Sequence, residues 1–199
     1  MGLERTENIS AVLQRITDRF LQIDEALKEK AKWDITLRGS GTTLTVACTL
    51  GANLVIGHVG DSRAYLLRDT QLTQLTTDHT LSQSLIDAGI ADRDDPAPRS
   101  MRHVLTAALG SLGKPIEPQV LHLKVYPGDQ LLLCTDGLTK MLEDKAIARV
   151  MGETNSALRA CEMLIDLTLA EGGFDNVTVA IQRFGPPSPA PNTQIQETT

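Results

Sequence analysis

The N-terminal segment carries apolar residues at alternating steps of four and three, while charged residues such as Arg15 and Asp24 fill the other side. The apolar positions are Ile9, Leu13, Ile16, Phe20, Ile23 and Leu27. This spacing predicts an amphipathic helix. About three heptads lie at the lower limit for a coiled coil, so we expect the helix to pack on its own domain.

After Trp33 the pattern changes to short runs that are rich in β-branched and apolar residues. Such runs, separated by turn residues, predict strands. The first four predicted strands cover residues 42–50, 53–59, 64–68 and 71–76. Because strands this close cannot be joined by crossover helices, we expect an antiparallel meander.

The rest of the chain alternates between helical and strand patterns. Asp78 is placed to cap a helix over 79–88 that Gly89 closes, and 91–100 is a charged loop with prolines. Further predictions are a strand at 104–109, a hairpin of 120–125 and 130–135, helices at 143–151 and 156–170, and a strand at 177–184. The pattern therefore predicts an α+β fold with antiparallel sheets covered by helices.

Composition limits the classes of function. The 25 acidic and 19 basic residues give a net charge of −6, and aromatic residues make up only 3%, which argues against nucleic-acid binding. We expect no membrane span, because no apolar run approaches the ~20 residues that one needs. Three cysteines without a CxxC pair favour a reducing, cytoplasmic location. We expect one domain over 1–184 and a disordered, proline-rich tail over 185–199.

Three aspartates share one local setting at the ends of predicted strands. Asp61 follows Gly60, Asp136 precedes Gly137, and Asp175 follows a Gly-Gly-Phe string. Glycines let the backbone turn tightly beside a ligand, and Mg²⁺ and Mn²⁺ prefer oxygen donors. Taken singly, however, an Asp before Gly or Ser is more often a turn residue than a metal ligand.

Six ordered strings around these aspartates resemble the metal-dependent protein phosphatases (the PPM, or type 2C, family), and their spacing is similar to that of the bacterial branch. The resemblance covers about residues 33–184. The strings are GSGTTL at 39–44, VGDSRAY at 59–65, TDHT at 77–80, VLTAALG at 104–110, GD at 128–129 with CTDGL at 134–138, and GFDNVT at 173–178.

This resemblance implies a four-layer α-β-β-α sandwich of two antiparallel sheets. It also implies hydrolysis of phosphoserine and phosphothreonine in proteins by a metal-activated water, without a covalent enzyme intermediate. Mn²⁺ or Mg²⁺ would be the cofactor. By the same resemblance, Asp136 and Asp175 match the ligands of the core metal, and Asp61 matches a carboxylate that, with Asp136, binds a third, more labile metal.

One large departure accompanies the resemblance. Family members begin with a phosphate-binding arginine, an acidic pair and a strand ending in Asp-Gly-x-Gly-Gly, whose Asp bridges the two core metals. No Asp-Gly pair precedes residue 51 here, and Arg5, Arg15 and Arg19 lie on or next to the predicted helix. We therefore expect an N-terminally truncated sandwich that lacks its first strands and half of the metal site. A smaller departure is Ala107, where the family often has arginine.

Three hypotheses about function follow. The chain is a protein serine/threonine phosphatase, a non-catalytic relative that binds a phosphoprotein or another partner, or a fragment whose parent is the phosphatase. We expect weak binding of Mn²⁺ or Mg²⁺ with little turnover. We also expect poor stability or self-association through exposed sheet edges, because missing strands leave edges unpaired.

Overall fold

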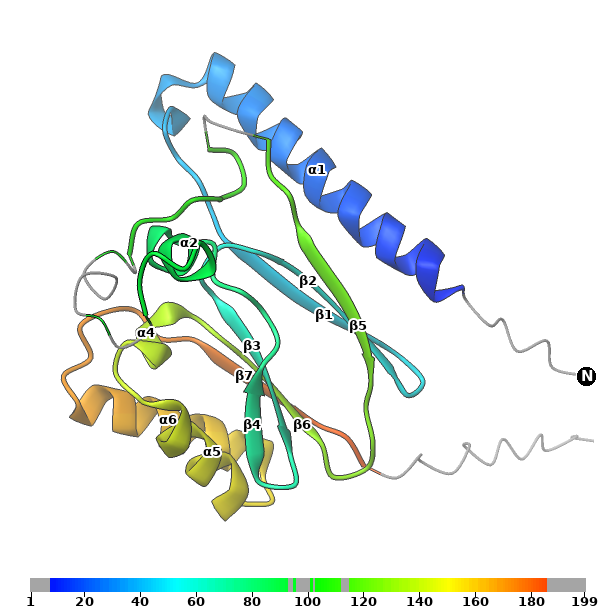
Figure 1. Cartoon of the computed structure of the whole chain (residues 1–199), viewed down its shortest axis with the longest axis vertical. Coiled ribbons are helices and arrows are strands. Elements are labelled where there is room, and N and C mark those ends of the chain that lie inside the picture. The colour runs from blue at the N-terminus through cyan, green and yellow to red at the C-terminus, as the bar shows by residue number, and fades with distance from the viewer. Residues whose placement is uncertain (1–7, 93–94, 96–100, 102, 112–114, 186–199) are drawn as a thin grey trace, which may run out of the picture.

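The computed structural model describes residues 8–92, 95, 101, 103–111 and 115–185, and their strands form two antiparallel sheets (Figure 1). The first sheet has the order β1-β2-β5, with β1 at Leu44–Leu50, β2 at Asn53–Val59 and β5 at Gln119–Lys124. The second has the order β4-β3-β6-β7, with β4 at Gln71–Gln74, β3 at Arg63–Arg68, β6 at Gln130–Cys134 and β7 at Val179–Arg183.

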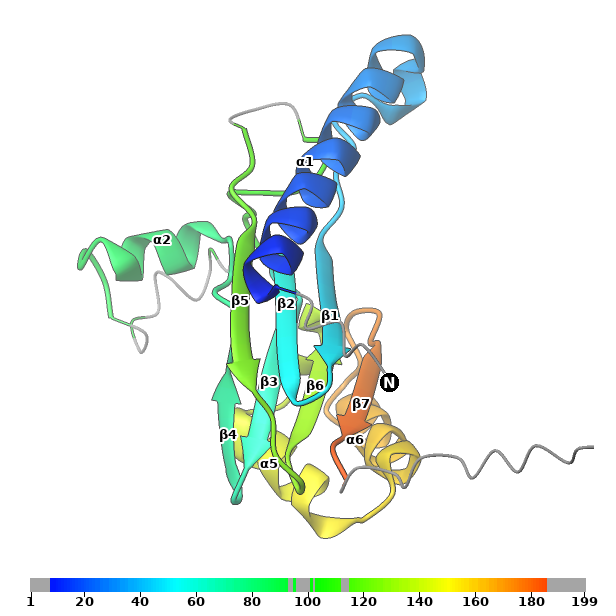
Figure 2. The same ribbon diagram turned by 90° about the vertical axis from the view of Figure 1, so that its right-hand side faces the viewer.

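Helices cover the outer faces of both sheets, which gives the predicted four-layer sandwich (Figure 2). Helix α1 (Ile9–Trp33) lies on the first sheet and is followed by the short 3-10 helix η1 (Ile35–Leu37). Helices α5 (Asp144–Glu153) and α6 (Ala157–Ala170) cover the second sheet. Two shorter helices, α2 (Leu81–Asp87) and α4 (Asp136–Thr139), lie near the loops at one end of the strands.

Three apolar clusters fill the spaces between these layers. Phe20 and Val59 belong to the cluster under α1, Ile56 and Leu66 to the cluster between the sheets, and Leu132 to the cluster under α5 and α6. The inner strands are therefore buried on both faces, which explains why their sequences read as continuous apolar runs rather than as alternation.

Gly57 of β2 shows how closely α1 approaches the first sheet. A Cβ at this position would lie 2.6 Å from Ile16 and 2.8 Å from Phe20, so only glycine fits without a shift. Ile16 and Phe20 of the predicted apolar stripe thus pack on the sheet, and the interpretation of this segment as a helix on its own domain is confirmed. The stripe is shorter than predicted, because Ile23 and Leu27 are exposed. Asp24, predicted on the polar side, is buried and accepts a hydrogen bond from the Gly110 N–H.

The meander prediction was wrong in one respect, because β2 and β3 are consecutive strands in different sheets. The chain leaves the first sheet at Gly60, whose φ is +118°, and enters the second at Arg63. The predicted hairpin was wrong for the same reason, since β5 pairs with β2 while β6 pairs with β3 and β7. Strands that are buried on both faces carry no signal of which sheet they join.

Two local predictions also need correction. Residues 104–109 form no strand and make only isolated bridges, from Leu109 to Thr42 and from Leu105 to Thr80. The cap of α2 is Thr80 rather than Asp78, and the Thr80 hydroxyl accepts a hydrogen bond from the Gln83 N–H. The predicted tail lies outside the described residues from 186 onward, as does most of the predicted loop over 91–100.

Candidate functional site

The loop from Gly60 to Ser62 carries Asp61 across from one sheet to the other. A Cβ on Gly60 would lie 2.3 Å from the Thr43 side chain, so the tight crossing requires glycine there. Asp61 is half-buried, and its burial, together with the negative charge of Asp136, raises the pKa of its carboxyl group. Since the charged form of this carboxyl group is disfavoured, a cation bound beside it would stabilise that form.

Asp136 opens helix α4 directly after β6, and Gly137 allows the next loop to approach it. A Cβ on Gly137 would lie only 2.2 Å from the carbonyl oxygen of Asn176. The Thr135 hydroxyl further ties the two segments, because it accepts a hydrogen bond from the Thr178 N–H at 3.0 Å. The end of β6 and the loop before β7 therefore lie in contact, which brings Asp175 next to Asp136.

Lys140 joins these two aspartates. Its ammonium nitrogen lies 2.5 Å from Oδ2 of Asp136 and 3.0 Å from Oδ2 of Asp175. Hydrogen bonds from Lys140 and from the Asn176 N–H lower the pKa of Asp175, and the hydrogen bond to Asp136 is the main cause that raises the pKa of Lys140. Asp136 and Asp175 thus already share one cation.

The structure brings the three predicted aspartates to one end of the sandwich without closing a metal site. Among the residues that it describes, no three His, Cys, Asp or Glu side chains gather closely enough to hold a metal ion. The Asp136–Asp175 pair supplies only oxygen donors, which suits Mg²⁺ or Mn²⁺, and such ions keep several waters when protein ligands are few. The donor chemistry therefore fits a hard divalent cation at this pair.

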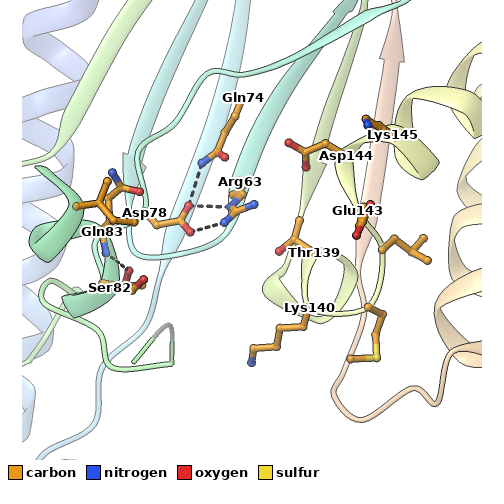
Figure 3. Close-up of a pocket in the computed structure, with 14 residues that line it drawn as sticks. Arg63, Gln74, Asp78, Ser82, Gln83, Thr139, Lys140, Glu143, Asp144 and Lys145 are labelled. Carbon is orange, nitrogen blue, oxygen red and sulfur yellow. Dashed lines mark hydrogen bonds and ion pairs between the residues drawn. The ribbon is translucent and has the colours of Figure 1, made fainter. Parts of the chain in front are cut away.

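A cavity of about 610 Å³ opens beside Lys140, between α2 and the start of α5 (Figure 3). Arg63 and Asp78 form a two-pronged ion pair on its wall, with N–O distances of 2.8 and 2.6 Å, and the Gln74 amide donates to Asp78 at 3.0 Å. Arg63 is therefore held in an ion pair on the cavity wall. The role of Asp78 in this pair replaces its predicted role as a helix cap.

The surroundings of Cys134 and of three histidines suit structural rather than catalytic roles. Burial raises the pKa of the Cys134 thiol to about 12, which leaves it unsuited to act as a nucleophile. The rings of His58 and His79 lie 5.0 Å apart under the Gly60 loop, and the His79 ring accepts a hydrogen bond from the Gly60 N–H. His122 is exposed and pairs with Asn53.

The sequence reasoning missed Lys140 and the helix that carries it. A signal was available, since Asp136 and Lys140 are four residues apart, the spacing at which opposite charges meet on a helix. The contact of Lys140 with Asp175 depends on the approach of a loop 35 residues away along the chain, which the spacing of the motifs does not indicate.

The structure has two antiparallel sheets between helical layers, and the three aspartates lie where strands of the second sheet begin or end. This arrangement defines the sandwich class of metal-dependent phosphatases, which the sequence motifs resemble. Residues 3–85 match the sequence profile of the family Protein phosphatase 2C. The chain is 31% identical over 180 residues to the serine/threonine phosphatase stp of Listeria innocua. The matched region covers 90% of this chain and 70% of that protein. The chain therefore belongs to the protein phosphatase 2C family.

Other relatives and structures agree with this assignment. The serine/threonine protein phosphatase PstP of Mycobacterium tuberculosis is 36% identical to this chain over 158 residues. The matched region covers 79% of this chain but only 30% of that relative. The structure of the S. agalactiae serine/threonine phosphatase superposes with a TM-score of 0.81 and 29% identity, over 87% of this chain and 71% of that one. A PstP catalytic domain solved in complex with two manganese ions gives a TM-score of 0.69 at 37% identity, over 79% of this chain and 65% of that one.

Proposed function

We propose that the protein is a metal-dependent serine/threonine phosphatase that acts on phosphorylated proteins. The observation that carries this proposal is the convergence of Asp136 and Asp175 beside a polar cavity of about 610 Å³, with Asp61 close enough to Asp136 for the two charges to interact. Family membership supports the same reaction. The chain spans only 30–63% of the length of the first relatives that it matches.

In this proposal Asp136 and Asp175 hold a Mn²⁺ or Mg²⁺ ion, and Asp61 adds a carboxylate on the Asp136 side. A divalent ion at such a site lowers the pKa of water and withdraws charge from phosphate oxygens. The chain's own contribution is to fix the carboxylates, through the close contact at Gly137 and the Gly60 turn. The cavity beside Lys140 gives a phosphorylated side chain room to enter.

A second candidate is a phosphatase-like domain that binds a phosphoprotein or another partner without hydrolysis. One observation favours it, because Lys140 already neutralises part of the charge of the aspartate pair. Arg15 and Arg19 lie on α1 beside β1, so neither replaces the arginine that binds phosphate in the family.

The experiment that separates the two candidates measures hydrolysis and binding of one phosphothreonine peptide. With Mn²⁺ we expect hydrolysis that Asp136→Asn abolishes, because this change removes one of the two carboxylates that would hold the metal. Peptide binding without hydrolysis, unchanged in Asp136→Asn, supports the binding domain instead. If the peptide is neither bound nor hydrolysed, both candidates fail.

We further propose that a second copy of the chain pairs with the free edge of β1. Among the described residues β1 pairs only with β2, and apolar cavities of about 370 and 260 Å³ flank its two faces. Val46 lines the first cavity and Ala47 the second, as expected for successive residues of one strand. An added strand would therefore bury apolar side chains on both faces.

The remaining proposals concern location and excluded partners. We propose that the protein is cytoplasmic, which is supported by three unpaired cysteines, Cys48, Cys134 and Cys161. We also propose that it binds neither nucleic acid nor membranes, given the net charge of −6. No helix among the described residues has both the length and the apolar character to cross a membrane.

A further inference from the structure

Lys140 occupies the position between Asp136 and Asp175 that a shared cation would take. Its ammonium group contacts Oδ2 of both aspartates, at 2.5 and 3.0 Å. The two carboxylates come from different segments, one at the start of α4 and one in the loop before β7. Because Lys140 closes α4 four residues after Asp136, the helix itself aims its side chain at the pair.

We propose that Lys140 is a built-in competitor for the divalent metal at the Asp136–Asp175 pair. The inference rests on the proposed function, because it assumes that these two carboxylates are the metal ligands. It goes beyond that function by assigning a regulatory role to a residue of this chain. A metal ion at these oxygen atoms and the Lys140 ammonium group repel each other at contact distance, so the ion binds more tightly once the ammonium leaves.

The side chain of Lys140 has room to move away from the two aspartates. It is 37% exposed, so it can rotate without unpacking the core, and it lines the cavity of about 610 Å³. Glu143 and Asp144 line the same cavity and offer negative charge to a displaced ammonium group. The exchange therefore needs a change of side-chain rotamer and no movement of α4.

Competition of this kind weakens metal binding by the free energy of the two ion pairs that are lost. Both pairs are partly exposed, so each is weak. We expect removal of the Lys140 charge to tighten metal binding about tenfold, which corresponds to about 1.4 kcal/mol.

The test is a titration of the 199-residue chain with Mn²⁺, in which free Mn²⁺ is followed by electron paramagnetic resonance. We expect Lys140→Met to lower the dissociation constant about tenfold, and Lys140→Arg to keep it near the wild-type value, because the charge is retained. The matched control is Lys145→Met, which removes a lysine from the same cavity that has no ion pair to Asp136 or Asp175 among the described residues.

The outcomes separate this inference from the proposed function. Equal Mn²⁺ affinity in the wild type and Lys140→Met overturns the competition but leaves the metal site in place. Tightening by Lys145→Met to the same extent also overturns it, since general charge would then be the cause. Failure of every variant to bind Mn²⁺ overturns both the metal site and the competition.

The rise in melting temperature on addition of Mn²⁺ gives a second readout, which the loss of a merely structural lysine would not change. Without metal, Lys140→Met should lower the melting temperature, because Asp136 and Asp175 lose their common counter-charge. With Mn²⁺ in excess, the rise in melting temperature should be larger in Lys140→Met than in the wild type, since tighter binding stabilises the native state more. A rise of the same size in both proteins contradicts the proposal.

Discussion

Gly137 and Asn176 approach each other so closely that a Cβ on Gly137 would lie 2.2 Å from the carbonyl oxygen of Asn176. This contact is the point at which the start of α4 meets the loop before β7. It sets the distance between Asp136 and Asp175, which flank the contact on either chain segment. The geometry of the candidate site thus depends on the absence of one side chain.

We predict that Gly137→Ala lowers the free energy of unfolding by about 1–3 kcal/mol, the range for overpacking a tight contact. The same change should weaken Mn²⁺ binding, because the loop with Asp175 must move away. The control is Gly152→Ala in α5, where a Cβ meets nothing within 4 Å and should stabilise the helix by up to about 1 kcal/mol. Chemical denaturation and Mn²⁺ titration measure the two effects, and an unaltered Gly137→Ala protein contradicts the prediction.

The elements of the fold were easier to predict than their assignment to sheets. The strand predicted at 53–59 has the observed bounds of β2, because a run buried on both faces is unmistakably apolar. Because β2 and β3 are both apolar, the pattern does not indicate that the chain passes from the first sheet to the second at Gly60. The aspartates at strand ends were identified from their motifs, whereas Lys140 emerged only when two distant segments were placed in contact.

Stability should fall as the pH falls below 6.5, because His58 is buried. Burial and the nearby His79 lower the pKa of His58 to about 4, from about 6.5 in an unfolded chain. Between these values the unfolded state binds the extra proton, so stability rises with pH and His58 accounts for up to about 3 kcal/mol of the loss on acidification. His79, whose pKa burial also lowers, acts in the same direction.

The His58 contribution can be isolated with His58→Leu, since this residue lies on the same face of β2 as Leu54 and Ile56. His58 Nε2 has no hydrogen-bond partner among the described residues, so His58→Leu removes only the hydrogen bond between Nδ1 and the Thr45 hydroxyl, at 2.8 Å. We expect a flatter dependence of unfolding free energy on pH between 4 and 6.5. The exposed His122→Gln variant is the control, and an unchanged slope in His58→Leu rules out the assignment.

Self-association should depend on β1. We predict a mass above the 21.6 kDa of one chain in size-exclusion chromatography with light scattering, and a return to the monomer when Val46 and Cys48 are both replaced by lysine. Both residues line the cavity between α1 and β1, and lysines on an edge strand oppose pairing. Leu169→Lys, on the exposed face of α6, is the control. A wild-type monomer with a cooperative melt contradicts the prediction.

Asp61→Asn should have opposite effects with and without metal. The half-buried Asp61 carboxylate is repelled by Asp136, so its replacement should raise the unfolding free energy without metal by about 0.5–1 kcal/mol, the scale of one charge interaction in such a place. If Asp61 also contacts the metal, Mn²⁺ should stabilise Asp61→Asn less than the wild type. The control is Asp69→Asn in the β3–β4 turn, which removes the same charge from an exposed position and whose backbone φ of +47° asparagine tolerates. Thermal melts with EDTA and with Mn²⁺ measure both effects. An equal Mn²⁺ effect in Asp61→Asn and the wild type excludes Asp61 from the metal site. A lower stability of Asp61→Asn in EDTA excludes the repulsion by Asp136.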